Sequence, residues 1–190
     1  MAQPIREKSM PEVFFTSDQH FGHERIVRLC NRPFKDAQEM DERLIANWNA
    51  VVGPKDDVWC LGDFSMGRPD AINRILRRLS GRKHLIRGNH DRVTGVEWTS
   101  LQDATTITAG GRKFYLHHYP VRDWPGKWSR VLHLYGHVHG NLRPEPGTME
   151  VGVDVWGGRP VSAEELVVAI GEFKPTHELL QPFRSRSWCG

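Results

Sequence analysis

The first half of the chain alternates short apolar runs with amphipathic stretches, and this alternation restricts the folds that the chain can adopt. The runs Val13–Ser17, Asp57–Leu61 and His84–Arg87 have the length and the apolar content of buried strands. The stretches Asp36–Val52 and Pro69–Leu79 lie between them and carry apolar residues at helical spacing. Strand, helix, strand, helix, strand in this order predicts a parallel sheet covered by helices.

The second half of the chain predicts more local pairing of strands. Gly110-Gly111 separates the runs Ala104–Ala109 and Lys113–His117, which is a hairpin signal. Further strands are expected at Val131–Tyr135 and Met149–Val155. The sheets are therefore expected to be mixed, within an α/β fold class.

A last helix is expected at Ser162–Glu172, where Ser162 is the N-cap and Glu165 completes a capping box. We find no linker and no internal repeat. We therefore expect one domain over residues 1–190, with its core at residues 12–173 and a C-terminal extension at 174–190. A chain of this length can bury a sizeable core without disulfides or metals to staple it.

Composition argues against several classes of protein. No apolar segment approaches the ~20 residues that span a bilayer, so no membrane partner is expected, and the opening residues MAQPIREKSMPEV lack the apolar region of a secretory signal. The cysteines Cys30, Cys60 and Cys189 show no CxxC spacing and are expected to be reduced thiols of a cytoplasmic protein. The net charge is only +3, but residues 74–92 hold seven Arg or Lys against one Asp. This segment fits either an anionic partner or a solvated helix face.

The informative pattern is that polar side chains follow the predicted strands at the point where each strand ends. The carboxyl ends of strands in one open sheet meet in one place, where α/β proteins build their sites. These residues are therefore expected to converge: Asp18 and His20, Asp63, Asn89, His90 and Asp91, His117 and His118, and His137 and His139.

Two of these groups, Asp18/His20 and His137/His139, place potential metal ligands two residues apart. In extended backbone such residues point to the same side, so each pair can present two ligand atoms to one point. The glycines at 62, 88 and 136 are expected to let the backbone come close to an ion or a phosphate, where a Cβ would clash.

Seven donors are more than one tetrahedral zinc ion accepts. They suit two divalent ions that share a carboxylate, and the mixture of imidazole, carboxylate and amide oxygen without thiolate favours Mn²⁺, Fe or Zn²⁺. Two such ions outweigh two aspartates in charge, so the site is expected to attract an anion, with phosphate the obvious one. The donor set consists of Asp18, His20, Asp63, Asn89, His118, His137 and His139.

In this order, the motifs DQH, GD, GNHD, HYP and GHVH resemble the five signature motifs of the calcineurin-like metallophosphoesterases. The resemblance reaches from Phe14 to about Pro160 and implies a four-layer α/β/β/α sandwich with a dinuclear metal centre. Departures matter as well. The GD motif continues as Phe64-Ser65-Met66-Gly67 instead of the VDRG of protein phosphatases, whereas HFGH, MDERLIANWN and VGVDVWGGRPVS look like the small stand-alone bacterial and phage phosphoesterases.

The resemblance also implies roles for individual residues. The first ion would be held by Asp18, His20 and His139, the second by Asn89, His118 and His137, and Asp63 would bridge the two. His90 would protonate the leaving alkoxide or stabilise the transition state, since a histidine can be protonated near neutral pH. The expected cofactor is a pair of divalent ions, with Mn²⁺ first and Fe, Zn²⁺ or Ni²⁺ as alternatives.

Several residues keep two interpretations. His118 is favoured over His117 as the ligand, because the family motif places the ligand directly before Tyr-Pro. His23 could contact substrate phosphate or make a hydrogen bond at a helix start, and Asp91 is expected to orient its neighbours instead of reacting. Trp124 and Trp128 could line the pocket, stack on a base or pack in the core: the sequence does not separate these alternatives.

The expected function is hydrolysis of a phosphoester by a metal-activated hydroxide, with a diester favoured over a monoester. A metal-dependent nuclease acting on nucleic-acid ends is the chief alternative, so nucleotides and nucleic acids are candidate substrates. A scaffold that has lost its metals is the alternative from another class. That alternative predicts an eroded ligand set, whereas all seven positions and His90 carry the residues that the family motifs require.

Overall fold

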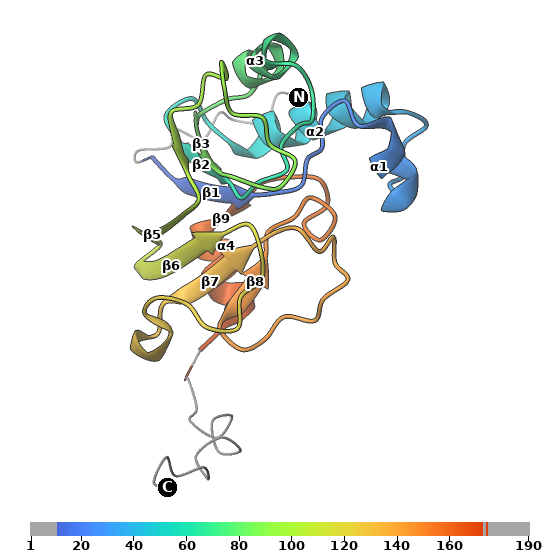
Figure 1. The fold of residues 1–190 in the computed structure, drawn as a ribbon. Coiled ribbons are helices and arrows are strands. Elements are labelled where there is room, and N and C mark those ends of the chain that lie inside the picture. The colour runs from blue at the N-terminus through green and yellow to red at the C-terminus, as the bar shows by residue number, and fades with distance from the viewer. Residues whose placement is uncertain (1–10, 173, 175–190) are drawn as a thin grey trace, which may run out of the picture.

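Two β-sheets pack face to face and helices cover their outer sides in the computed structural model, which describes residues 11–172 and 174. The five-stranded sheet has the order β4-β3-β2-β1-β9 and the four-stranded sheet the order β5-β6-β7-β8. Helices α1, α2 and α3 lie on one side, and α4 lies on the other side with the second sheet (Figure 1). The predicted α/β class with four α/β/β/α layers is confirmed.

The first sheet is the predicted parallel sheet. β1 pairs with β2, β2 with β3 and β3 with β4, all in parallel, and β9 adds an antiparallel edge. The three-residue strand β4 was not predicted, because its sequence has no apolar run. The strands span Val13–Thr16 (β1), Asp57–Cys60 (β2), Arg82–Ile86 (β3), Ser100–Gln102 (β4) and Val161–Ser162 (β9).

Three helices follow strands of this sheet: α1 at Glu24–Leu29, α2 at Ala37–Val51 and α3 at Pro69–Arg78. α2 and α3 match the predicted helices, and the short α1 was not predicted. The Asp36 side chain begins α2 by accepting the Glu39 N–H at 2.8 Å, which satisfies one of the unpaired donors at a helix start.

The second sheet contains the predicted hairpin. β5 (Ala104–Ala109) pairs antiparallel with β6 (Arg112–His117), and β7 (Leu132–Tyr135) and β8 (Thr148–Glu150) continue in parallel. A 3-10 turn covers Lys127–Ser129. The last helix α4 spans Ala163–Ile170, and its predicted capping box between Ser162 and Glu165 is present. α4 ends two residues before the expected Glu172, because the C-cap Gly171 has a positive φ of 67°.

The predicted strand Met149–Val155 is wrong beyond Glu150. Gly152 makes only an isolated bridge to Ser17, and the chain then turns, with the Gly158 N–H bonded to the Val153 carbonyl at 2.8 Å. The alternation of apolar residues in this run hides a turn that carries Asp154 back toward the first sheet.

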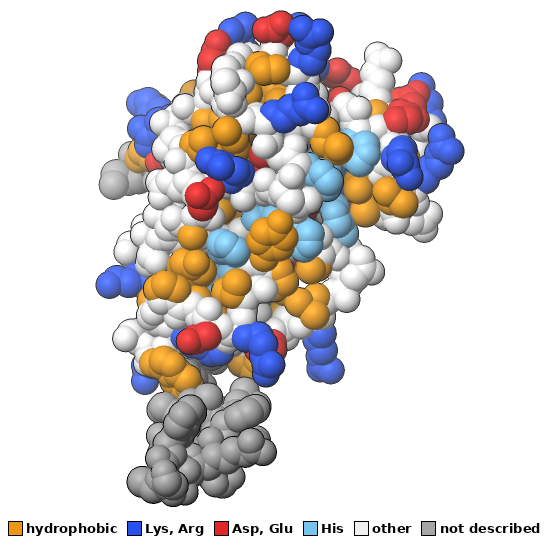
Figure 2. Space-filling model, in the orientation of Figure 1, with side chains coloured by type: hydrophobic (Ala, Val, Ile, Leu, Met, Phe, Trp, Pro, Cys, Tyr) orange, Lys and Arg blue, Asp and Glu red, His pale blue; other side chains and the backbone are white. Residues whose placement is uncertain are grey.

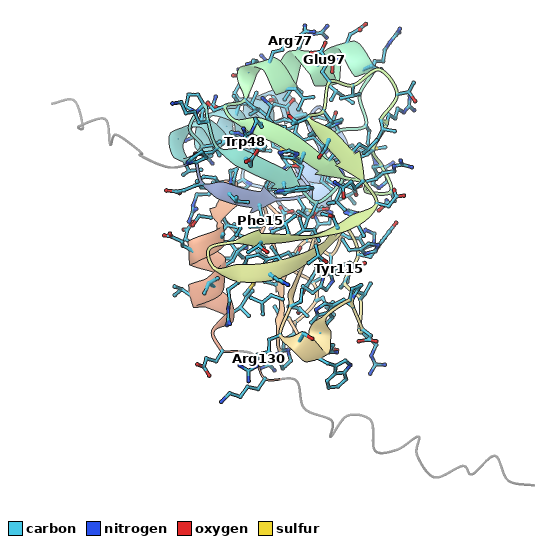
Figure 3. The ribbon with its side chains drawn as sticks, turned by 90° about the vertical axis from the view of Figure 1, so that its left-hand side faces the viewer. Phe15, Trp48, Arg77, Glu97, Tyr115 and Arg130 are labelled. Carbon is cyan, nitrogen blue, oxygen red and sulfur yellow. The ribbon has the colours of Figure 1, made fainter. Side chains whose placement is uncertain are left out.

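The core consists of two clusters, one on each face of the first sheet. The first lies under α2 and α3 and includes Trp48, whose Nε1 donates to the Ser80 carbonyl at 3.0 Å. The second lies between the sheets, where Phe15 packs on Phe114 with 5.3 Å between the ring centres. Figure 3 shows Trp48 and Phe15 at these two levels. Trp124 belongs to the second cluster, so of its alternatives the structure shows core packing.

The domain boundaries and the absence of a membrane span are the remaining expectations about the fold. The single domain over 1–190 stays a prediction, and the extension at 174–190 lies outside the described residues except for Lys174. Within the described part of the chain, every helix is too short or too polar to cross a bilayer.

Candidate metal centre

The predicted metal ligands lie in the loops that follow the strand ends, and five of the seven have left-handed backbone. Seven described residues other than glycine have a positive φ: Asp18, His20, Asn31, Asp63, Arg130, His137 and His139. Five of these are predicted metal ligands. A positive φ is energetically unfavourable for residues other than glycine. Such residues therefore cluster where function requires a particular direction of the side chain.

The expected extended backbone at Asp18/His20 and His137/His139 is wrong. These residues do not share a side through extended backbone, because all four have φ between 49° and 74°. Tight turns place their side chains, and the Asp18 N–H bonds to the Gly62 carbonyl at 2.9 Å to fix the first turn.

The first ligand group consists of Asp18, His20 and His139, whose potential ligand atoms all lie within 4.8 Å of one another. Asp18 is completely buried and is held in place by the Ser17 hydroxyl, which donates to Oδ2 at 2.6 Å, and by the His137 N–H. Burial raises the pKa of Asp18 to about 7, against the effect of the Ser17 hydrogen bond.

The second group consists of Asp63, His118 and His137, within the same 4.8 Å limit. Asn89 joins it, because Asn89 Oδ1 lies 3.0 Å from His118 Nε2. His118 Nδ1 lies 2.7 Å from the Leu61 carbonyl, which can only accept, so the proton of the neutral ring is on Nδ1. Nε2 then carries a lone pair that faces the Asn89 oxygen.

Asp63 lies between the two groups. Its Oδ2 is 3.7 Å from His20 Nε2 in the first group and 3.6 Å from His118 Nε2 in the second. Its Oδ1 accepts the His90 N–H at 2.9 Å, which fixes the direction of the carboxylate. One carboxylate therefore faces imidazoles of both groups.

The donor chemistry fits divalent ions. Both ring nitrogens of His20 are buried and have no hydrogen-bond partner. Burial, with the neighbouring His139 and Arg32, lowers the pKa of His20 to about 3, and burial also lowers the pKa of His118. A neutral imidazole nitrogen whose lone pair faces an oxygen acceptor is repelled by that oxygen unless a cation lies between the two atoms. We therefore conclude that the residues present fit a metal centre.

Two glycines make room for the carboxylates. A Cβ on Gly88 would collide with the Asp63 carboxylate and backbone, and one on Gly136 would collide with Ser17 and the Asp18 carboxylate. The expected approach to an ion or a phosphate stays a prediction, because the groups nearest to these glycines are Asp63, Ser17 and Asp18. No close approach to an ion or phosphate is needed to explain these glycines.

Asp154 and Arg32 belong to the site and were not predicted. Asp154 Oδ2 lies 2.7 Å from His139 Nδ1, and both Asp154 oxygens accept from the Arg32 guanidinium at 2.8 Å. Arg32 also donates to the carbonyl of Asp18 at 2.7 Å. The acceptor at Nδ1 leaves His139 Nε2 free to coordinate, an arrangement that orients metal ligands in many sites. The VGVDVW run contains the signal, but its alternating pattern resembles a strand.

The remaining predicted residues surround the ligands. Asp91 accepts three backbone N–H groups, from Asp63, Phe64 and Gly88, at 2.8 to 2.9 Å, which is an orienting contact. His90 is exposed, with its ring centre 5.6 Å from that of His20.

His117 and His23 differ in their relation to the site. His117 stacks on Tyr115 with 6.2 Å between ring centres, and its Nδ1 lies 3.0 Å from the Tyr119 carbonyl. His118 instead contacts Asn89 of the second group. His23 is the N-cap residue of α1, yet its side chain makes no capping hydrogen bond, and its buried Nδ1 has no partner. Of its two interpretations, the structure therefore excludes the capping bond.

A cleft of about 350 Å³ opens over the ligand groups. Figure 2 shows histidine side chains gathered on this face, with hydrophobic side chains at their border. The cleft is lined by His20, His23, Arg25, Ile26, Leu29, Asp63, Met66, His90, His137 and His139.

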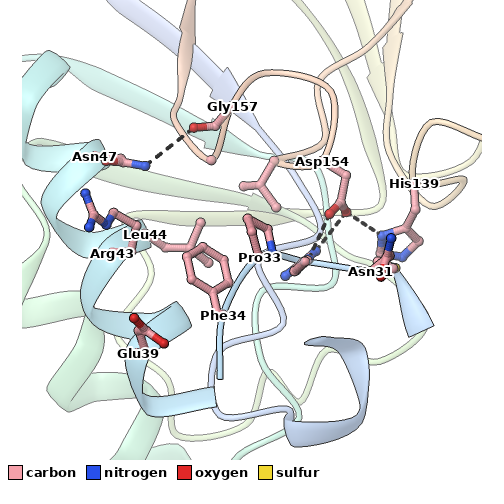
Figure 4. A pocket seen from close by; sticks show the side chains of 14 residues that line it. Asn31, Pro33, Phe34, Glu39, Arg43, Leu44, Asn47, His139, Asp154 and Gly157 are labelled. Atoms are coloured by element: carbon pink, nitrogen blue, oxygen red, sulfur yellow. Dashed lines mark hydrogen bonds and ion pairs between the residues drawn. The ribbon is translucent and has the colours of Figure 1, made fainter. Parts of the chain in front are cut away.

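A separate pocket of about 570 Å³ lies behind His139, between α2 and the loop that carries Asp154 (Figure 4). Phe34 and Leu44 form its apolar wall, and Asp154, hydrogen-bonded to His139, forms its end toward the ligands. This pocket therefore borders the first ligand group. His139 is the one residue that lines both this pocket and the cleft.

Nitrogen and oxygen donors that converge under an open cleft fit a metal-dependent hydrolase site. The comparison with known families agrees. Residues 12–152 match the model of the calcineurin-like phosphoesterase superfamily domain, so the chain belongs to this superfamily. Membership indicates metal-dependent phosphoester hydrolysis.

Individual relatives are of unassigned function. The uncharacterized protein MJ1445 of Methanocaldococcus jannaschii is 34% identical over 87% of this chain and 95% of its own length. The gene 66 protein of Mycobacterium phage L5 is 31% identical over 83% of this chain and 93% of its own. The crystal structure of the Aquifex aeolicus protein of unknown function AQ665 matches with a TM-score of 0.68 and 26% identity, over 85% of this chain and all of that one. The match with a phage protein agrees with the predicted small bacterial and phage type.

Proposed function

We propose that this chain hydrolyses phosphoesters with a pair of divalent ions, and that it prefers diesters. The observation that carries the proposal is the position of Asp63, whose Oδ2 lies 3.6 to 3.7 Å from an imidazole nitrogen of each ligand group. A carboxylate in this position can bridge two ions, which is the arrangement used for in-line displacement at phosphorus.

The proposed ligands follow the two groups. Asp18, His20 and His139 hold one ion, Asn89, His118 and His137 hold the other, and Asp63 is shared. When bound, the ions supply a nucleophile at neutral pH and neutralise charge on the phosphoryl group. The nitrogen and oxygen donors of both groups support Mn²⁺ first, with Fe, Zn²⁺ or Ni²⁺ as alternatives.

The chain's own residues supply the proton and the position of the substrate. His90 lies exposed at the cleft, where its ring can donate a proton to the leaving alkoxide. The Asp63 carboxylate accepts the backbone N–H of His90. This bond holds the backbone of the proposed general acid against the proposed bridging ligand. His23 and Arg25 line the same cleft and can contact phosphate oxygens.

The shape of the cleft supports the diester preference. The cleft is open to solvent, so a phosphate that carries a second substituent can enter it. A nuclease acting on nucleic-acid ends is the second candidate. The silent scaffold is disfavoured, because all seven proposed ligands and His90 are in place.

The decisive experiment is a substrate screen with the Mn²⁺-loaded protein. Bis-p-nitrophenyl phosphate, p-nitrophenyl phosphate, cyclic nucleotides and short oligonucleotides are compared for the wild type and for Asp63→Asn. We expect the diester to be hydrolysed faster than the monoester, and the loss of the bridging charge to abolish both reactions. No hydrolysis of any substrate by protein with two bound ions would contradict the proposal.

A further inference from the structure

A second hollow, over α3, borders the cleft over the ligands. This hollow measures about 580 Å³, which lies in the ~300–1,000 Å³ range of small-molecule sites. It shares His23 and Met66 with the cleft, so these two side chains form the boundary between the two spaces. A substrate fixed at the ligand groups can therefore extend past His23 into the hollow.

The hollow contains a cation that is not neutralised by a carboxylate. α3 carries three arginines toward its end: Arg77 pairs with Glu97 at 2.6 Å, and Arg78 pairs with Glu42 through two hydrogen bonds. Figure 3 shows Arg77 and Glu97 together at the outer end of the molecule. Arg74 lines the hollow and makes no hydrogen bond or ion pair with another described residue.

The walls around Arg74 are largely apolar. Ile75 and Ala71 form the side contributed by α3, and Met66, of which 42% is exposed, forms the side next to the cleft. Ser65 and Gly67 complete this side, and the Gly67 N–H donates to the Ser65 hydroxyl oxygen at 3.1 Å. A flat ring with polar edges suits these walls, and a phosphate suits the guanidinium of Arg74. A nucleoside with a further phosphate combines both features.

We propose that the hollow binds the nucleoside next to the scissile phosphate, and that Arg74 binds the following phosphate of a nucleotide chain. This inference rests on the proposed function and gives it a substrate class, the nucleotide phosphodiester. His23, at the boundary, contacts the scissile phosphate on the side that carries the nucleoside. The negative charge of Asp41, which also lines the hollow, disfavours binding of this second phosphate. The Gly22 N–H donates to both Asp41 oxygens at 3.0 Å.

The test uses two substrates with the same leaving group. They are thymidine 5′-(p-nitrophenyl phosphate) and the same compound with an added 3′-phosphate, each with Mn²⁺-loaded protein. The ratio of their kcat/KM values reports the added phosphate alone. We expect a ratio of about three to ten in the wild type, as a charge-assisted contact gives, and a ratio near one in Arg74→Ala. Arg74→Lys keeps part of the ratio, and Asp41→Asn raises it.

Arg77→Ala is the matched control, because it removes a neighbouring arginine of the same helix that lies outside the hollow. Its ratio stays at the wild-type value. A wild-type ratio of one, or equal ratios in the wild type and Arg74→Ala, overturns the inference and leaves phosphodiester hydrolysis intact. Absence of hydrolysis of both substrates, with two ions bound, overturns the proposed function and this inference with it.

Discussion

Asp154 Oδ2 lies 2.7 Å from Nδ1 of His139, so a carboxylate outside the ligand groups orients one of the proposed ligands. Arg32 binds both oxygens of the same carboxylate at 2.8 Å and continues to the carbonyl of Asp18. These contacts connect the loop after β8 to the loop after β1. The first ligand group is therefore assembled by residues that are far apart in sequence.

We predict that Asp154→Asn weakens metal binding by about 10- to 100-fold, the usual effect of losing the partner of a ligating histidine. The amide cannot supply the same charge to His139 and Arg32, so Nε2 becomes a weaker and less ordered donor. Competition with a fluorescent Mn²⁺ chelator measures the affinity without reference to activity. Glu97→Gln, which breaks an exposed ion pair on α3, serves as the control and keeps the wild-type affinity. Equal affinities in both variants would show that Asp154 has no part in the site.

The number of bound ions tests the division into two groups. Protein purified without chelator is expected to contain about two divalent ions per chain, because seven donors exceed the capacity of one tetrahedral ion. His20→Ala removes a ligand of the first group and His137→Ala one of the second, so each variant is expected to contain about one ion. Elemental analysis measures both. A content of zero that added Mn²⁺ does not restore contradicts the dinuclear assignment.

His90→Ala tests the proton donor. An alkyl alkoxide needs a proton to leave, whereas p-nitrophenolate needs little help, so the variant is expected to lose about 10²-fold or more in kcat for an alkyl ester and much less for a p-nitrophenyl ester. Steady-state kinetics on matched diesters of one alcohol and p-nitrophenol give the comparison. Losses of equal size for the two leaving groups would remove the general-acid role.

The sequence was sufficient to predict three strands of the first sheet, the strands of the second sheet and three of the four described α-helices, because these depend on local periodicity. Residue types at strand ends indicated the candidate site residues, whose roles stay a prediction. The sequence did not indicate the strands β4 and β9. It was not sufficient to predict the left-handed turns at Asp18, His20 and His139, since no local propensity of Asp or His requires a positive φ. Asp154 was missed for a related reason. Its apolar neighbours Val153 and Val155 suggest a strand, and only the bridge of Gly152 to Ser17 reveals a turn.

His133 provides a pH dependence that is separate from the proposed ligands. It is completely buried and accepts the Val121 N–H at Nε2 over 3.2 Å, and burial lowers its pKa to about 4 from the ordinary 6.5. The unfolded chain therefore binds a proton that the folded chain does not bind. The free energy of unfolding is therefore unaffected by His133 above pH ~6.5. It falls as the pH drops toward about 4, by about 3 kcal/mol for this group alone.

His133→Gln keeps an acceptor but cannot be charged, so the difference in the free energy of unfolding between the wild type and this variant isolates the titration. We expect the wild type to lose more stability than the variant between pH 6.5 and pH 4, when both are unfolded by urea in the absence of metal. Other buried histidines titrate in both proteins and cancel in the difference, because they are unchanged by the substitution. Parallel pH profiles would mean that His133 is solvated enough to accept its proton in the folded state, which is incompatible with its complete burial under Trp124 and Tyr135.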